Sequence, residues 1–235
     1  MIAGIKVFTD ASTVQDIRGY AAQDWVSGFT TNPTLMRQGG VTDYRHFAHE
    51  AIPAAAGKPL SLEVVADDPD TIHAQGLILG SWGPNVVVKV PITTTTGTSL
   101  LPAVRALLDA GVPVNVTAIL TDQQVTALAE TLRPDDPAIV SVFAGRIADT
   151  GIDPVPVMAR YATWLADLPA TQLLWASPRE VLNLVQARDT GCHIITVTPD
   201  LLRKATLIGK DLEQFSLETV RMFYDDALTA GLHIT

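Results

Sequence analysis

Short runs of apolar, often β-branched residues alternate along the chain with longer stretches in which apolar residues recur at helical spacing. Runs of this length and composition are typical of strands that are buried on both faces of a parallel sheet. They predict eight strands, at residues 5–9, 28–31, 60–65, 86–90, 114–117, 139–143, 172–175 and 193–197.

The longer stretches predict helices. Residues 98–110 carry leucines and a valine at helical spacing and are followed by Gly111, a common residue after a helix end. The same periodicity extends over residues 122–132 and 154–168. Pro69 and Pro178 stand where helices are expected to begin, because the missing N–H of proline is not needed in the first turn.

Eight strands that are each followed by a helix, at roughly 30 residues per unit, fit a (β/α)8 barrel. The sequence therefore predicts an α/β protein, a TIM barrel that occupies residues 1–235 as one domain, with residues 215–235 as an extra C-terminal helical tail. Two smaller domains would also fit 235 residues, but no linker or change of composition divides the chain. A doubly wound open sheet is the alternative fold, and residues 8–13 lack the glycine-rich phosphate loop that it would place there.

The composition narrows the class of partner. A net charge of -9 argues against nucleic acid and against anionic membrane surfaces. It leaves room for a small phosphorylated substrate, which needs only a local cluster of donors. No run approaches the ~20 apolar residues of a membrane span. The single cysteine, Cys192, and a first segment without the apolar core of a signal peptide predict a cytoplasmic protein.

Lys89 stands in the apolar run 85–91, which is a predicted buried strand. Lysine is rarely buried unless something pairs with it or uses it. Burial disfavours the charged ammonium and favours a nucleophilic amine, the form that attacks a carbonyl to give a Schiff base. The alternative is a lysine at a strand end whose ammonium reaches water.

Polar residues stand at the ends of the other predicted strands, where the catalytic groups of barrels project. They are Asp10, Thr31, Asn32, Glu63, Asn115, Thr117, Ser141, Arg146, Ser177, Arg179, Thr196 and Thr198. Barrel interiors are normally filled by aliphatic side chains. Burial of so many polar and charged groups would cost folding free energy if they served only to fill the interior. Asp10, Glu63 and Lys89 include both signs of charge and can pair with one another.

Six short motifs fall in order along the chain, at residues 8–12, 30–33, 88–91, 114–117, 143–147 and 176–179. With these motifs the sequence resembles the transaldolase family, in particular the short transaldolases and the related fructose 6-phosphate aldolases. The resemblance implies a (β/α)8 barrel and chemistry through a lysine imine, with no metal and no organic cofactor.

The resemblance also implies residue roles. Lys89 corresponds to the Schiff-base lysine, Asp10 to the acid/base at the C4 hydroxyl, and Glu63 with Thr117 to the holders of a catalytic water. Asn32 and Asn115 correspond to ligands of the dihydroxyacetone hydroxyls, Thr31, Ser141 and Phe143 to further substrate contacts, and Arg146, Ser177 and Arg179 to the phosphate site. Arginine forks suit phosphate, and a helix expected to open at Ser177 and Pro178 would add free N–H groups.

Two activities share this chemistry. Transaldolases resemble this chain in Glu63, Phe143 and Arg179, whereas the aldolases typically carry Gln and Tyr at the first two positions. A phenylalanine removes a hydroxyl that could promote protonation of the carbanion, which favours transfer. The sequence therefore predicts transfer of dihydroxyacetone from fructose 6-phosphate or sedoheptulose 7-phosphate to an aldose phosphate. The alternatives are a lyase that releases dihydroxyacetone, a transaldolase for an unusual sugar, and an inert sugar-phosphate-binding barrel.

Three other patterns have simpler interpretations. Residues 93–96 are four threonines, whereas the family usually has an acidic residue in this loop just before the glycine. We expect these residues to form a solvated loop that caps the next helix through Thr96 or Thr98. His46, His49 and Glu50 have metal-compatible spacing but lack further ligands, so an exposed helix is expected. Residues 217–231 are amphipathic and predict packing on the barrel or on a neighbour, in a homo-oligomer such as a pentamer or decamer.

Overall fold

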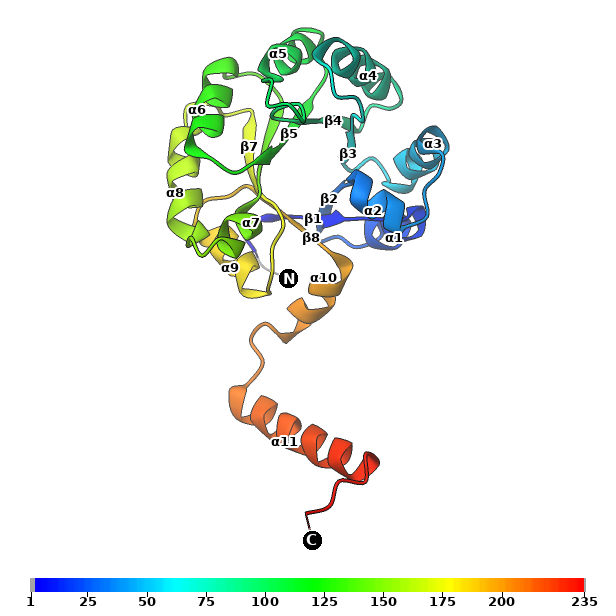
Figure 1. Cartoon of the computed structure of the whole chain (residues 1–235), viewed down its shortest axis with the longest axis vertical. Coiled ribbons are helices and arrows are strands. Elements are labelled where there is room, and N and C mark those ends of the chain that lie inside the picture. The colour runs from blue at the N-terminus through cyan, green and yellow to red at the C-terminus, as the bar shows by residue number, and fades with distance from the viewer. Residues whose placement is uncertain (1–2, 235) are drawn as a thin grey trace.

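A closed barrel of eight parallel strands forms the centre of the structure, a computed structural model that describes residues 3–234 (Figure 1). The strands are β1 (Lys6–Asp10), β2 (Val26–Thr30), β3 (Leu60–Glu63), β4 (Val86–Pro91), β5 (Val114–Ile119), β6 (Ala138–Val142), β7 (Thr171–Trp175) and β8 (Ile194–Val197). Each strand pairs with the next, and β8 closes the barrel on β1. The predicted barrel is confirmed, and strand ends differ from the prediction by two residues at most.

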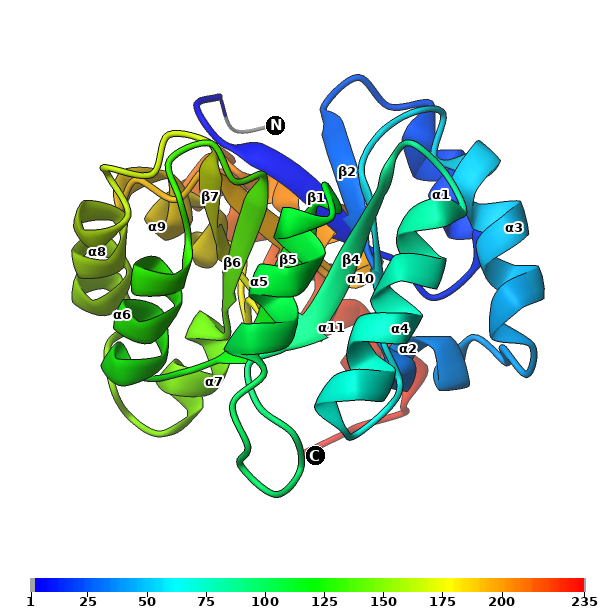
Figure 2. The ribbon, with the colours of Figure 1, turned by 90° about the horizontal axis from the view of Figure 1, so that it is seen from above.

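Helices surround the barrel on its outer face, except for the last one, which stands away from it (Figures 1 and 2). They are α1 (Val14–Ala21), α2 (Pro33–Gln38), α3 (Tyr44–Ala54), α4 (Pro69–Ser81), α5 (Leu101–Asp109), α6 (Asp122–Thr131), α7 (Ala144–Asp149), α8 (Pro154–Trp164), α9 (Leu182–Asp189), α10 (Pro199–Lys204), the 3-10 turn η1 (Ala205–Leu207) and α11 (Leu212–Thr229). Gly76 lets α4 approach α5, because a Cβ there would lie 2.7 Å from a Leu107 methyl. The close packing of α4 on α5 thus explains why α4 has a glycine at position 76.

Two predicted helix starts are wrong. Helix α5 begins at Leu101 rather than at residue 98, because Thr93 pairs with Ser99 in an isolated bridge and the intervening threonines fold back on themselves. The Thr94 hydroxyl accepts the Thr98 N–H at 3.1 Å. The predicted capping of this helix by Thr96 or Thr98 is wrong, and the Leu101 N–H donates instead to Ser99 Oγ at 3.3 Å. Pro178 also lies outside a helix, since α9 begins at residue 182. The start at Pro69 is confirmed.

The barrel interior has an apolar layer toward the amino ends of the strands. Phe8, Ile139, Leu174 and Ile194 pack together there and are all buried. Gly28 makes room for the Phe8 ring, because a Cβ on Gly28 would lie 2.6 Å from it. On β1, β6 and β8 the next residue on the same face is polar, namely Asp10, Ser141 and Thr196. The apolar layer therefore separates the polar carboxyl end of the interior from the amino-end opening, which Lys6 and Gln172 line.

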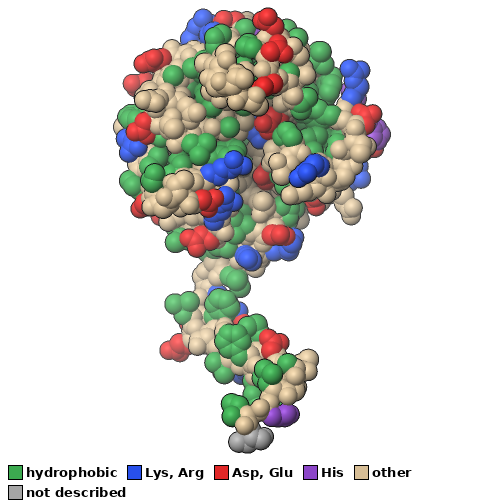
Figure 3. Space-filling model, viewed as in Figure 1, with side chains coloured by type: hydrophobic (Ala, Val, Ile, Leu, Met, Phe, Trp, Pro, Cys, Tyr) green, Lys and Arg blue, Asp and Glu red, His purple; other side chains and the backbone are tan. Residues whose placement is uncertain are grey.

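Helix α11 stands away from the barrel, and none of its side chains is buried (Figures 1 and 3). Several apolar side chains are therefore exposed along it: Leu212, Phe215, Leu217, Val220, Met222, Phe223, Tyr224 and Leu228. Over residues 3–234, no helix combines the length and the apolar character that crossing a membrane requires.

Candidate active site

A cavity of about 490 Å³ opens at the carboxyl end of the barrel. Its lining contains five ionisable side chains: Asp10, Glu63, Lys89, Arg146 and Arg179. Most of the remaining polar wall is formed by Thr30, Asn32, Thr117, Ser141, Ser177, Thr196 and Thr198, and the Phe143 ring also lines the cavity. Figure 3 shows this face of the molecule, with basic side chains beside a hollow near its centre. Most of the residues that the sequence singles out therefore come together.

Lys89 lies in the wall of this cavity, on β4, and is only 6% exposed. The strand register places its Cα beside those of Glu63 on β3 and Asn115 on β5. Its Nζ lies 3.0 Å from Glu63 Oε2 and donates a hydrogen bond of 2.8 Å to the Thr31 carbonyl. Because the amine is held inside the barrel by protein groups, the interpretation as a lysine that reaches bulk water is wrong.

Asp10 lies at the end of β1, beside Thr30 of β2 in the register. Burial raises the pKa of Asp10 above its ordinary value of 3.8, while the Lys89 charge and a hydrogen bond from Thr30 oppose this rise. The Thr30 hydroxyl donates to Asp10 Oδ1 at 3.1 Å. A carboxylate with a raised pKa and a hydroxyl partner can take up and return a proton during a reaction.

Asn115 is fixed by two serines inside the barrel. Its Nδ2 donates to Ser61 Oγ at 3.0 Å, and the Ser141 hydroxyl donates to its Oδ1 at 2.6 Å. Glu63 Oε2 and Thr117 Oγ1 differ, since both are buried and neither makes a hydrogen bond of good geometry among residues 3–234, although Glu63 Oε2 forms the ion pair with Lys89. Buried polar atoms normally find partners, so these two atoms can hold a water or a substrate group.

The opposite wall of the cavity carries the arginines. Arg146, on α7, lies over the Phe143 ring at 4.9 Å from its centroid. The Arg179 guanidinium binds the Asp149 carboxylate through two nitrogens, with Nε at 3.1 Å from Oδ1. Two guanidinium groups against one carboxylate leave a surplus positive charge at this wall, which suits an anionic group such as phosphate.

The turn after β7 positions this wall. Ser177 has a φ of 59°, a left-handed conformation that is uncommon for a serine. Gly145 permits the turn, since a Cβ there would lie 1.6 Å from the Ser177 carbonyl oxygen. Asn183 Oδ1 accepts the N–H groups of Arg179 and Glu180 at 2.7 Å and 3.1 Å. These N–H groups are satisfied by a side chain, so the expected helix N-terminus at Pro178 is absent from the site.

Two sequence candidates have a different environment from the one expected. The Thr31 side chain is fully buried, and its hydroxyl donates to the Ser61 carbonyl at 2.9 Å. Thr31 contacts Lys89 only through its main-chain carbonyl, which accepts a hydrogen bond from the amine. Asn32 Oδ1 caps α2 by accepting the Leu35 N–H at 2.9 Å. This leaves the Asn32 amide N–H groups for the cavity that it lines.

Four polar groups of the site had no role assigned from the sequence. Thr30 and Thr196 bond to each other beside Asp10, and Ser61 holds Asn115. The Tyr44 hydroxyl donates to the Glu63 carbonyl at 2.8 Å, and burial raises the pKa of Tyr44. The polar alternation of the strands includes Ser61 and Thr196, but nothing in the sequence joins Tyr44 to β3.

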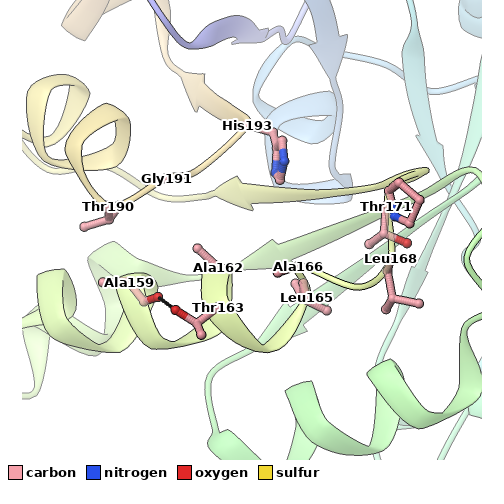
Figure 4. Close-up of a pocket in the computed structure, with 11 residues that line it drawn as sticks. Ala159, Ala162, Thr163, Leu165, Ala166, Leu168, Thr171, Thr190, Gly191 and His193 are labelled. Carbon is pink, nitrogen blue, oxygen red and sulfur yellow. Dashed lines mark hydrogen bonds between the residues drawn. The ribbon is translucent and has the colours of Figure 1, made fainter.

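A second hollow lies at the amino end of the barrel, between α8 and the segments that lead into β7 and β8 (Figure 4). Small and apolar residues line most of it, with His193 on one side. His193 Nδ1 accepts the Leu173 N–H at 3.0 Å, and burial, followed by the Lys6 charge, lowers the pKa of His193. The lining of this hollow contains one ionisable side chain, against five in the carboxyl-end cavity, so it offers fewer groups for catalysis.

The two histidines of α3 contact other side chains. His46 lies 3.7 Å from Glu50 on an exposed face, and His49 packs against the Trp82 ring. Within residues 3–234, no three His, Cys, Asp or Glu side chains are grouped as metal ligands would be.

A barrel with a buried lysine, two carboxylates and two arginines around a cavity at its carboxyl end has the arrangement typical of barrel enzymes, whose active sites lie at that end. Residues 7–233 match the model of the family described as Transaldolase/Fructose-6-phosphate aldolase. The chain belongs to this family, and the resemblance seen in its motifs is confirmed.

Relatives of full length support this assignment. A "Probable transaldolase" of Herpetosiphon aurantiacus is 32% identical over 91% of this chain and 94% of its own. Another, from Thermoanaerobacter sp., is 30% identical over 98% of this chain and 100% of its own. Among solved structures, 2,3-dimethylmalate lyase superposes with a TM-score of 0.58 at 10% identity, over 97% of this chain and 84% of that one. At that identity the likeness concerns the fold alone.

Proposed function

We propose that the protein is a transaldolase that transfers a dihydroxyacetone unit from fructose 6-phosphate or sedoheptulose 7-phosphate to an aldose phosphate. The observation that carries this proposal is the buried Lys89 amine, paired with Glu63 in a cavity that Asp10 also lines and whose opposite wall has Arg146 and Arg179. A ketose phosphate needs a nucleophile at its carbonyl and a cationic group at its phosphate, and this cavity supplies both.

The reaction begins at Lys89. Its amine attacks the ketose carbonyl, and loss of water gives an imine that withdraws electrons from C3. Glu63, which is paired with Lys89, and Thr117, whose buried hydroxyl has no hydrogen-bond partner among residues 3–234, would hold the water that carries protons in this step. Ser141, Asn32 and Asn115 would bind the hydroxyls of the dihydroxyacetone unit.

Cleavage then follows at the C3–C4 bond. Asp10 takes the proton of the C4 hydroxyl, the aldose phosphate leaves, and the electron pair stays on the three-carbon fragment bound to Lys89. A second aldose phosphate accepts this fragment at its carbonyl, Asp10 returns the proton, and hydrolysis frees Lys89. Arg146, Ser177 and Arg179 would hold the phosphate so that the carbonyl faces the amine.

The test is borohydride reduction in the presence of fructose 6-phosphate, followed by mass spectrometry of the peptide that contains Lys89. We expect a covalent adduct at Lys89, and glyceraldehyde 3-phosphate as product when erythrose 4-phosphate is added. Lys89→Met is the control and should give neither. Equal release of free dihydroxyacetone without an acceptor would favour the lyase, and ligand binding without an adduct would favour an inert binding barrel.

We also propose that the enzyme is cytoplasmic and a homo-oligomer, such as a pentamer or decamer. The apolar side chains of α11 support this, since Val220, Phe223 and Leu228 are each more than half exposed in the single chain. A monomer by light scattering would contradict the assembly.

A further inference from the structure

Three side chains from three strands form a chain of hydrogen bonds at the edge of the candidate active site. Asp10 ends β1, and the two threonines come from the strands on either side: Thr30 of β2 is beside Asp10 in the register, and Thr196 of β8 is beside Phe8. Thr30 and Thr196 are 3% and 5% exposed, and their hydroxyl oxygens are in direct hydrogen-bond contact. The contact exists only because the barrel closes, since β2 and β8 are far apart in the sequence.

The direction of the chain follows from counting protons. A threonine hydroxyl has one proton to donate. Thr30 gives its proton to Asp10 Oδ1 at 3.1 Å. The Thr30 oxygen therefore accepts in its contact with Thr196, and Thr196 is the terminal donor. Both donations point toward Asp10, which is the arrangement that stabilises a carboxylate.

Asp10 needs this support because its surroundings disfavour charge. Burial is the largest influence on Asp10, and Glu63 on β3 is a second negative group that faces it. Lys89 on β4 is the positive group that faces it, but in the proposed reaction this nitrogen becomes part of an imine. The hydroxyl chain is the stabilising influence that does not change with the state of Lys89.

The same two hydroxyls also suit the protonated state. Once Asp10 holds a proton, it can donate to Thr30, and Thr30 can donate to Thr196, with no heavy atom displaced. Hydroxyl groups reverse in this way because each can donate and accept. A valine at either position has the same shape but can do neither.

We propose that Thr196 is a positioning residue for Asp10 that acts through Thr30 and keeps the carboxylate ready to accept a proton. This inference rests on the proposed role of Asp10 in carbon–carbon bond cleavage. It assigns a role to β8, a strand that contributes no charged group to the cavity lining.

The test compares Thr196→Val with Thr196→Ser, which keeps the hydroxyl, and with Thr30→Val and the double variant. With Thr196→Val, we expect the acidic limb of the pH profile of kcat for dihydroxyacetone transfer to move upward by roughly half to one pH unit. Thr196→Ser should match the wild type. In the Thr30→Val background, Thr196→Val should produce no further shift, because the route through Thr30 is already lost.

A second measurement does not depend on turnover. Titration of the Asp10 carboxyl by 13C NMR, assigned with Asp10→Asn, should show the same upward shift in Thr196→Val and none in Thr196→Ser. Unchanged titration in a folded Thr196→Val protein would overturn the proposal, as would an equal shift in the Thr30→Val background. If the wild type neither transfers nor releases dihydroxyacetone, the proposed function fails, and the carboxyl titration still decides whether the hydroxyl chain tunes Asp10.

Discussion

Glu63→Gln is expected to weaken both the folded state and the reaction. The substitution removes a negative charge that lies 3.0 Å from Lys89 Nζ, and it nearly preserves the shape of the side chain. The Glu63 and Lys89 side chains are 16% and 7% exposed, so solvent and salt screen the pair only weakly. The ammonium of Lys89 would keep its hydrogen bond to the Thr31 carbonyl and the longer-range attraction of the Asp10 carboxylate.

The structure sets the size of the effect. Two unit charges at this separation attract by about 5–6 kcal/mol at an effective dielectric constant of about 20. Relief of the desolvation of Glu63 offsets part of this loss, and removal of one partner from a buried pair typically costs roughly 3–5 kcal/mol. Because Lys89 retains the Thr31 carbonyl as a partner and the attraction of the Asp10 charge, we expect the free energy of unfolding to fall by about 1–3 kcal/mol.

Urea unfolding at neutral pH measures this loss. Glu50→Gln is the matched control, because Glu50 faces only His46 on an exposed helix and should leave the midpoint unchanged. In the same variant, kcat for transfer should fall by about 10²–10⁴-fold, since Glu63 is a proposed proton carrier. A Glu63→Gln protein as stable as Glu50→Gln would refute the reasoning that the pair supports the fold.

Three further predictions concern Asp10, Phe143 and Arg179. Asp10→Asn should abolish transfer yet stabilise the protein at neutral pH, because burial raises the folded-state pKa of Asp10 and ionised Asp10 therefore costs stability above that pKa. The gain should shrink as pH falls through that pKa, and urea unfolding across pH checks the sign. Phe143→Tyr should raise the ratio of free dihydroxyacetone to transfer product, because it adds a hydroxyl in the cavity lining; an unchanged ratio would count against the proposed basis for transfer. Arg179→Lys should raise KM for fructose 6-phosphate about tenfold by loss of the guanidinium fork, with little change for unphosphorylated fructose; equal effects on both sugars would argue against a phosphate contact.

The sequence predicted the barrel because its strands are buried on both faces and stand out as apolar runs. It also predicted which polar residues would meet, since the carboxyl ends of parallel strands share one end of a barrel. Asp10, Glu63, Lys89 and Thr117 all line the same cavity. Alternation within a strand was enough to find Asn115 and Thr117 on one face.

Local patterns were less informative where tertiary contacts decide the conformation. A Ser-Pro sequence is compatible with a helix start, but the contact of Gly145 with the Ser177 carbonyl and the capping by Asn183 hold residues 177–180 as a loop. The Thr31 side chain was placed in the site from its motif, yet it bonds to the Ser61 carbonyl instead. Such contacts join strands and loops that are distant in the sequence, and no periodicity records them.

The interior separates stability from chemistry along the barrel axis. Phe8, Ile139, Leu174 and Ile194 form the apolar layer, so Phe8→Ala should destabilise the fold by about 3–5 kcal/mol through the cavity that it leaves. The polar layer above it contains groups whose burial opposes folding, and Asp10 is the clearest of them. Substitutions in the two layers should therefore have opposite effects. Substitutions in the apolar layer should lower stability, while the molecules that still fold keep their activity. Substitution of Asp10 in the polar layer should abolish activity and leave stability unchanged or higher. Glu63 differs from Asp10 because its charge is paired at 3.0 Å, which is why its removal is expected to lower both quantities.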